Sequence, residues 1–131
     1  MTGAPEISPQ VFHVEVDSTA NLVLVRYCGR VIAAEVKKCA AEIATRVGEL
    51  QPGFRLLVDL TDLDVMEIDC ATHLERIMNL CNEKGVATVA RIIPDPRRDI
   101  GLQIMSYFHY DPEVRVVTCA TAGEAMDELA F

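Results

Sequence analysis

Apolar residues recur along this chain with two different periods, and the changes of period divide it into strands and helices. Alternation over 11–16, turn residues at 17–21 and an apolar, β-branched run at 22–29 predict an antiparallel hairpin. From 31 to 50 the period becomes that of an amphipathic helix, with one apolar face and one charged face. The apolar face comprises Val36, Ala40, Ile43, Val47 and Leu50.

The rest of the chain alternates apolar strands with amphipathic helices. Strands are expected at 54–60, 86–93 and 114–120. The first of these is nearly all apolar, so it is expected to be covered on both faces. Helices are expected at 69–84 with an Asp69 cap, at 96–109 after Asp95-Pro96, and from a capping box at Thr121–Glu124.

This order of elements predicts the fold class. An opening hairpin followed by strand-helix alternation indicates an α/β protein with a single mixed β-sheet, in which parallel strands follow the hairpin and four helices pack on them. The length of 131 residues fits one domain, expected at 11–131 after a loose lead-in at 1–10.

Three segments in this order resemble the STAS domain, the domain of sulfate-transporter tails and bacterial anti-sigma-factor antagonists. They are the strand LLVDL at 56–60, the helix start IDCATHLERI at 68–77 and the closing TAGEAMDEL at 121–129. The resemblance covers the chain from Val11 onward and rests on element order and pattern. It implies a regulatory binding module rather than an enzyme.

The signature loop of that family reads Asp-Ser-Ser-Gly, and its second serine is phosphorylated by a partner kinase. On this chain the resemblance places Asp69, Cys70, Ala71 and Thr72 at those four positions. Alanine has no hydroxyl group, so the resemblance implies a divergent member that lacks the phospho-acceptor. Thr72, one residue later, is the nearest hydroxyl.

Charge and composition exclude several classes of function. Twelve basic and twenty acidic residues give a net charge of −8, which repels nucleic acids and anionic membrane surfaces. No apolar run reaches the roughly 18 residues of a membrane span, and the first ten residues lack the pattern of a signal peptide. Five scattered cysteines indicate reduced thiols. We therefore expect a cytoplasmic protein.

The segment 61–69 follows the central strand and carries most of the candidate chemistry. It contains Asp62, Asp64, Glu67 and Asp69. Clustered carboxylates can bind a divalent cation or transfer protons. A solvated acidic loop with one helix cap is more common, and we favour it. In either case the loop projects from a strand end, where it is expected to contact a partner.

Cys70, Thr72 and His73 lie at the start of the next predicted helix. Cys70 and His73 share a helical face, but a structural zinc site needs four ligands and no second pair is present. A helix N-terminus can also activate a thiol as a nucleophile, yet no orienting group accompanies this one. A buried structural thiol and a surface histidine are therefore favoured.

Arg97 and Arg98 follow the strand at 86–93 and the helix start at Asp95-Pro96. Arginines beside free backbone N–H groups can form an anion site, whereas ion pairs with neighbouring carboxylates are the more common outcome. Parallel strands end at one edge of a sheet, so 61–72 and 94–98 are expected to form a common rim.

Asp59 ends the central strand, as the phospho-acceptor of receiver domains does. Such domains need a further acidic pair after the first strand and a lysine late in the fold. Only Asp17 follows the first strand, and no lysine lies beyond Lys84. A receiver-type phosphorylation site is therefore excluded.

These observations favour a non-enzymatic, STAS-like regulatory or ligand-binding module. Its rim would bind a regulatory protein or a small anionic ligand. The alternative is a small anion or lipid carrier, or an enzyme, with a pocket between the helices at 69–84 and 96–109. No cofactor, metal or nucleic acid is expected, and a homodimer is left open.

Overall fold

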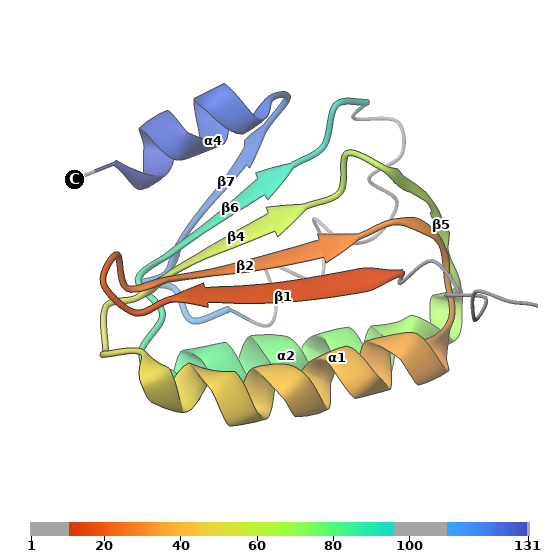
Figure 1. Ribbon diagram of the computed structural model, residues 1–131, viewed down its shortest axis with the longest axis horizontal. Coiled ribbons are helices and arrows are strands. Elements are labelled where there is room, and N and C mark those ends of the chain that lie inside the picture. The colour runs from red at the N-terminus through yellow and green to blue at the C-terminus, as the bar shows by residue number, and fades with distance from the viewer. Residues whose placement is uncertain (1–10, 96–109, 131) are drawn as a thin grey trace, which may run out of the picture.

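A five-stranded sheet forms the centre of the computed structural model, which describes residues 11–95 and 110–130 (Figure 1). The order is β1-β2-β4-β6-β7, with β1 antiparallel to β2 and the other neighbours parallel. The bounds are β1 Phe12–Asp17, β2 Leu22–Tyr27, β4 Arg55–Asp59, β6 Thr88–Ile92 and β7 Arg115–Cys119. This is the predicted mixed sheet with an opening hairpin.

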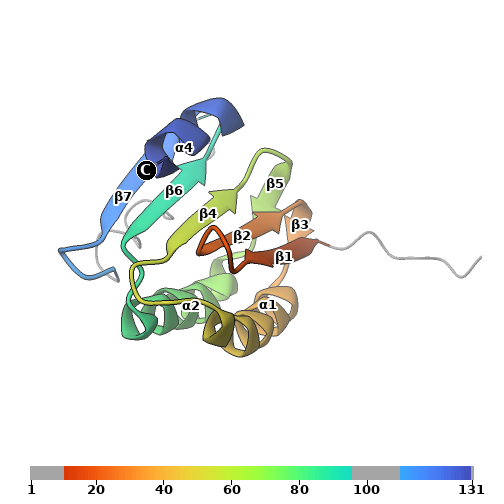
Figure 2. The same ribbon diagram turned by 60° about the vertical axis from the view of Figure 1, so that its left-hand side comes forward.

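Helices lie on both faces of this sheet. Figures 1 and 2 show α1 and α2 side by side on one face, and α4 on the other face over β6 and β7. Their bounds are α1 Ala33–Arg46, α2 Ala71–Lys84 and α4 Ala122–Leu129. The described residues thus contain three α-helices. The fourth predicted helix, at 96–109, lies outside the described residues.

The sheet separates two apolar clusters, and the central strand β4 contributes to both. Leu56 packs in the larger cluster beneath α1 and α2, whereas Leu57 packs in the smaller cluster beneath α4. Both side chains are buried, and burying a leucine stabilises a fold by roughly 1.5–3 kcal/mol. The prediction that this strand is covered on both faces is confirmed.

The hairpin turn is fastened to the rest of the fold by two polar side chains. Asn21 adopts a positive φ of 53°, and its side chain exchanges hydrogen bonds of 2.8 and 3.2 Å with the backbone of Gln51. Arg55 donates to the carbonyls of Ala20 and Leu129. The turn is therefore tied both to the end of the α1 region and to the end of α4.

The expected acidic loop at 61–69 is partly a strand, which corrects the sequence prediction. The strand predicted at 22–29 ends at Tyr27, and the chain turns at Gly29, whose φ is +65°. A short strand β3, Gly29–Val31, then pairs in parallel with β5, Leu63–Met66, as a separate two-stranded sheet. Long-range pairing satisfies these backbone groups, which local pattern could not reveal.

The boundaries of the first two helices also differ from expectation. The α1 helix starts at Ala33 and passes into a 3-10 turn, η1, at Val47–Glu49. Asp69 does not cap α2, because it lies within another 3-10 turn, η2, at Ile68–Cys70. No side chain caps the start of α2, whereas its predicted end at Gly85 is confirmed by a left-handed φ of 87°.

Candidate functional site

The parallel strands end together, as the rim prediction requires. The ladder between β4 and β6 is extended by a hydrogen bond of 3.0 Å from Leu60 N–H to the carbonyl of Ile92. Ile93 N–H donates to the carbonyl of Cys119 at 2.8 Å, which extends the ladder to β7. The segments that leave β4 and β6 therefore start at one edge of the sheet, which we call the rim.

The two-stranded sheet of β3 and β5 builds the projecting part of this rim. Gly29 N–H donates to the carbonyl of Asp62 at 2.9 Å, and Glu67 N–H donates to the carbonyl of Val31 at 3.0 Å. The Glu67 carboxylate accepts from Arg30 Nη2 at 2.6 Å. Backbone pairing thus fixes the segment that sequence reasoning treated as a loop.

One face of this two-stranded sheet exposes apolar side chains. Val65 lies opposite Arg30 in the register, so Val65, Arg30 and Ile32 point to the same side. Val65 is 49 % exposed and Ile32 is 41 % exposed. Ile68, in the turn before α2, is 92 % exposed. We call Ile32, Val65 and Ile68 the rim patch.

Sequence reasoning missed the rim patch. The three residues lie near apolar or acidic neighbours in the sequence, and nothing local distinguishes them from core positions. The available signal was the polar-apolar alternation from Asp62 to Val65, which is the period of a half-exposed strand.

Three of the predicted acidic residues, Asp62, Asp64 and Asp69, are exposed. Across residues 11–95 and 110–130, no group of three histidine, cysteine or acidic side chains is arranged to hold a metal ion. The Glu67 carboxylate is paired with Arg30. Asp62 and Asp69 thus place negative charge in the segment that carries the rim patch, whereas Asp64, which alternates with Val65, points to the other face of β5.

Asp59 is buried at the end of β4, and a local network of hydrogen bonds holds its side chain. Its carboxylate accepts from Thr61 N–H at 2.9 Å, from Thr61 Oγ1 at 2.5 Å and from Arg26 Nε at 3.2 Å. Burial opposes ionisation, but the hydrogen bonds from Thr61 and the charge of Arg26 outweigh it and lower the pKa of Asp59. Asp59 therefore ties the residues that follow β4 to the end of β2.

Cys70 does not belong to the exposed rim, which corrects its place among the predicted site residues. Its side chain is fully buried, and its Sγ lies 3.5 Å from the carbonyl oxygen of Val31. Burial and the nearby Asp69 raise the pKa of the Cys70 thiol. A raised pKa favours the unreactive thiol over the nucleophilic thiolate. The structural role favoured from sequence fits these observations.

The remaining predicted site residues divide into two groups. Thr72 is exposed and His73 is half-buried on the first turn of α2, beside the rim. Arg97 and Arg98 lie outside the described residues, as does the helix they were expected to begin. The predicted proximity of Asp69 and Arg97, and with it the anion site, stays a prediction.

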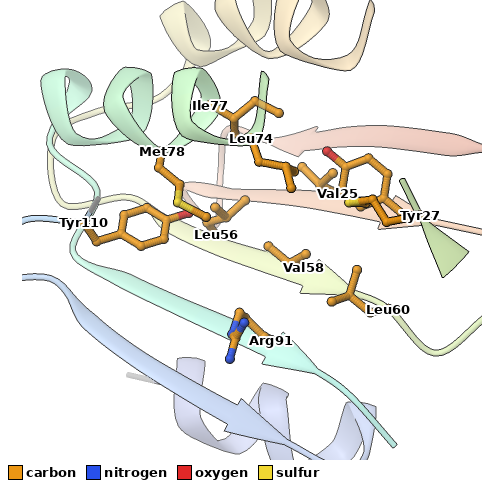
Figure 3. Close-up of a pocket in the computed structure, with 11 residues that line it drawn as sticks. Val25, Tyr27, Leu56, Val58, Leu60, Leu74, Ile77, Met78, Arg91 and Tyr110 are labelled. Atoms are coloured by element: carbon orange, nitrogen blue, oxygen red, sulfur yellow. The ribbon is translucent and has the colours of Figure 1, made fainter. Parts of the chain in front are cut away.

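A small cavity lies between α2 and the sheet, on the described side of the pocket predicted between two helices (Figure 3). Its walls are mainly apolar, and its volume is about 40 Å³. Arg91 lines it, is 4 % exposed and donates from Nη2 to Thr118 Oγ1 at 2.9 Å. Tyr27 and Tyr110 also line it, and burial raises the pKa of both.

Ligand pockets of proteins typically occupy about 300–1,000 Å³. The cavity bounded by the described residues is smaller by roughly a factor of ten, which leaves room for a few water molecules. A lipid or a metabolite of ordinary size does not fit in it.

Comparison with solved structures identifies the fold. An uncharacterized protein of the DUF3478 family from Shewanella loihica, described as having a SpoIIAA-like fold, matches with a TM-score of 0.69 and 16 % identity, covering 91 % of this chain and 92 % of that one. The anti-sigma factor antagonist SpoIIAA in its unphosphorylated form matches with a TM-score of 0.61 and 21 % identity, over 90 % and 96 %.

An anti-sigma factor antagonist from Mycobacterium paratuberculosis matches with a TM-score of 0.59 and 15 % identity, over 93 % of this chain and 97 % of that one. No protein-family model and no curated protein matches the sequence. The chain therefore has the SpoIIAA-like, STAS-type fold that the sequence resemblance predicted, and at these identities the likeness concerns the fold alone.

A membrane-spanning helix must be long and predominantly apolar, and the helices in the described parts of the chain are short and amphipathic. None of them is both long enough and apolar enough to cross a bilayer.

Proposed function

We propose that this protein is a non-enzymatic regulatory module that binds another protein through the rim. The observation that carries the proposal is the 92 % exposure of Ile68 beside Val65 and Ile32. Exposing an isoleucine to water forgoes the stabilisation that its burial would provide, roughly 1.5–3 kcal/mol. Contiguous exposed apolar side chains are typical of interaction sites.

The borders of the rim patch indicate the chemistry of the partner. Specific interfaces commonly combine an apolar centre with a polar, solvent-accessible border. Here Asp62 and Asp69 are exposed in the segment that carries Val65 and Ile68, and the chain carries a net charge of −8. The partner surface is expected to offer an apolar contact surrounded by lysine or arginine, which would also accelerate association.

The likeness to two anti-sigma factor antagonists supports a protein partner, because the fold is shared over nearly the whole chain. The mode of regulation is proposed to differ from a phosphoserine switch. Ala71 occupies the position that the resemblance assigns to the phosphorylated serine, and a methyl side chain cannot accept a phosphoryl group. Thr72 is exposed at the next position.

The buried Cys70 thiol, with its raised pKa, favours this proposal over the enzyme. The carrier stays an alternative, because the helix expected at 96–109, which would form one wall of its pocket, lies outside the described residues. The anion site with Arg97 and Arg98 stays an untested alternative. It predicts stabilisation by small anions that is lost when both arginines become alanine.

A photocrosslinking amino acid placed at position 68 tests the proposal. In extracts of the source cells we expect a discrete crosslinked product that excess wild-type protein displaces and excess Ile68→Asp protein does not. Position 44 supplies the control, because Ala44 is also an exposed apolar residue but lies on α1 and lines neither proposed surface. Absence of a product at 68, or the same product from both positions, would contradict the proposal.

A further inference from the structure

A second apolar surface lies on the face of the sheet that α4 covers only in part. On β2, Val23 and Val25 point beneath α1 and α2 and are at most 2 % exposed. Leu22 and Leu24 point to the opposite face, where they remain half-exposed. Together with Leu57 of β4, they line an open groove of about 430 Å³ that also extends past the edge strand β1 to Arg46 of α1.

The groove has walls on two sides. The edge strand β1 contributes Glu15 and Asp17 to one side, and α4 contributes Met126 to the other. Figures 1 and 2 show α4 over β6 and β7, with β1 and β2 uncovered on that face by any described helix. We call this surface, from β1 to Met126, the sheet groove.

The width of the uncovered strip matches one helix. Neighbouring strands lie about 4.8 Å apart, so the distance from β1 across β2 to β4, where the cover of α4 begins, is about 10 Å. An α-helix with its side chains is about 10–12 Å in diameter. The strip therefore has room for a single helix beside α4, much as α1 and α2 lie side by side on the other face.

Charge decides which helix suits the groove. Glu15 and Asp17 are exposed on the β1 side and line the groove, whereas on the α4 side the lining residue is Met126. Arg46 also lines the groove, but Glu49 pairs with it at 2.6 Å. Apolar side chains therefore form the floor and the α4 margin, while acidic side chains lie along the β1 margin.

We propose that the sheet groove binds an amphipathic helix of a partner protein, with its apolar side on the leucine floor and Met126, and lysine or arginine along the flank that meets Glu15 and Asp17 of β1. Such helix-in-groove recognition depends on apolar anchors at helical spacing. The groove lies near the hairpin turn, and the rim lies at the opposite ends of the strands (Figure 1). The module is therefore able to hold two partners at once.

A labelled model peptide tests this inference. The probe is a helical peptide of leucine and lysine with its leucines on one face, and the matched peptide carries glutamate in place of lysine. We expect the lysine peptide to bind, measured by fluorescence anisotropy, and to weaken as salt rises. The glutamate peptide should not bind. Equal binding of both peptides would overturn the charge argument.

Three surface variants locate the binding. Met126→Lys and Glu15→Lys should each weaken binding of the lysine peptide, and together by about tenfold or more. Ile68→Asp, at the rim, should leave it unchanged. All three side chains are exposed, so unchanged melting temperatures will show that the variants fold. Loss of binding in Ile68→Asp, with none in the groove variants, would overturn the assignment.

Methyl NMR spectra identify the occupied surface directly. Addition of the lysine peptide should shift the methyl signals of Leu22, Leu24 and Met126. Shifts confined to the rim would overturn the inference. So would a concentration-dependent dimer that Met126→Lys abolishes, because a second copy of this chain would then be the occupant.

Discussion

The carboxylate of Asp59 offers the sharpest test of the energetics at the end of β4. Two hydrogen bonds from Thr61 and one from Arg26 reach it. The Arg26 side chain is 44 % exposed, so solvent screening limits the ion pair to well under 1 kcal/mol. The Thr61 bonds are shorter, at 2.5 and 2.9 Å, and hydrogen bonds to charged groups contribute about 1.5–3 kcal/mol.

We therefore expect Asp59→Ala to lower the free energy of unfolding by about 2–3 kcal/mol. Asp59→Asn should cost about 1 kcal/mol, because an amide oxygen can still accept from Thr61 while the charge is lost. Urea unfolding followed by circular dichroism at neutral pH measures both. Arg26→Leu is the matched control for the ion pair alone, and it should cost least.

The pH dependence of stability tests whether the ionised form of Asp59 stabilises the fold. Because the folded pKa of Asp59 lies below its unfolded value, ionisation of this residue stabilises the fold above about pH 4. That contribution is lost as the pH falls through the lower folded pKa. The difference between wild type and Asp59→Asn should thus be constant from pH 7 to about pH 4 and shrink below it. A difference that shrinks already between pH 7 and 5 would refute the assignment.

Three further substitutions or modifications have defined outcomes. Gly85→Ala should lower stability in thermal melts by more than 1 kcal/mol, because φ at Gly85 is +87° and a new Cβ would lie 3.2 Å from Pro52 Cβ. Gly48→Ala is the control and should change stability little, because the space around Gly48 is open. Thr121→Ala should cost about 1 kcal/mol in the same assay, since Thr121 Oγ1 accepts from the backbone N–H that starts α4, and a neutral result would contradict the cap. Burial raises the pKa of Cys81 to about 12, so a native-state thiol assay should label it far more slowly than the unfolded protein, and equal rates would disprove its burial.

The two proposed binding surfaces, the rim and the sheet groove, depend on different parts of the structure and can be tested separately. The rim patch depends on the pairing of β3 with β5, whereas the groove depends on how little of the sheet α4 covers. Ile68→Asp changes the first surface, and Met126→Lys changes the second. Failure of one proposal therefore leaves the other standing.

Periodicity determined the order of strands and helices because burial imposes a period of two on a strand and of about 3.6 on a helix. The apolar alternation in β1 and β2, the helical face of α1 and the turn residues before Leu22 express these local constraints. Gly85 and Thr121 end and start helices through their own backbone and side-chain chemistry, so they were also readable from the sequence. The mixed sheet followed from that order.

Only the tertiary structure decided which side chains form a surface. The pairing of β3 with β5 joins residues more than thirty positions apart, and no local pattern encodes it. That pairing made a strand out of an expected acidic loop, placed Ile68 in water and buried Cys70 against Val31. Exposure depends on neighbours that are distant in sequence. The candidate sites therefore had to be found in the folded molecule.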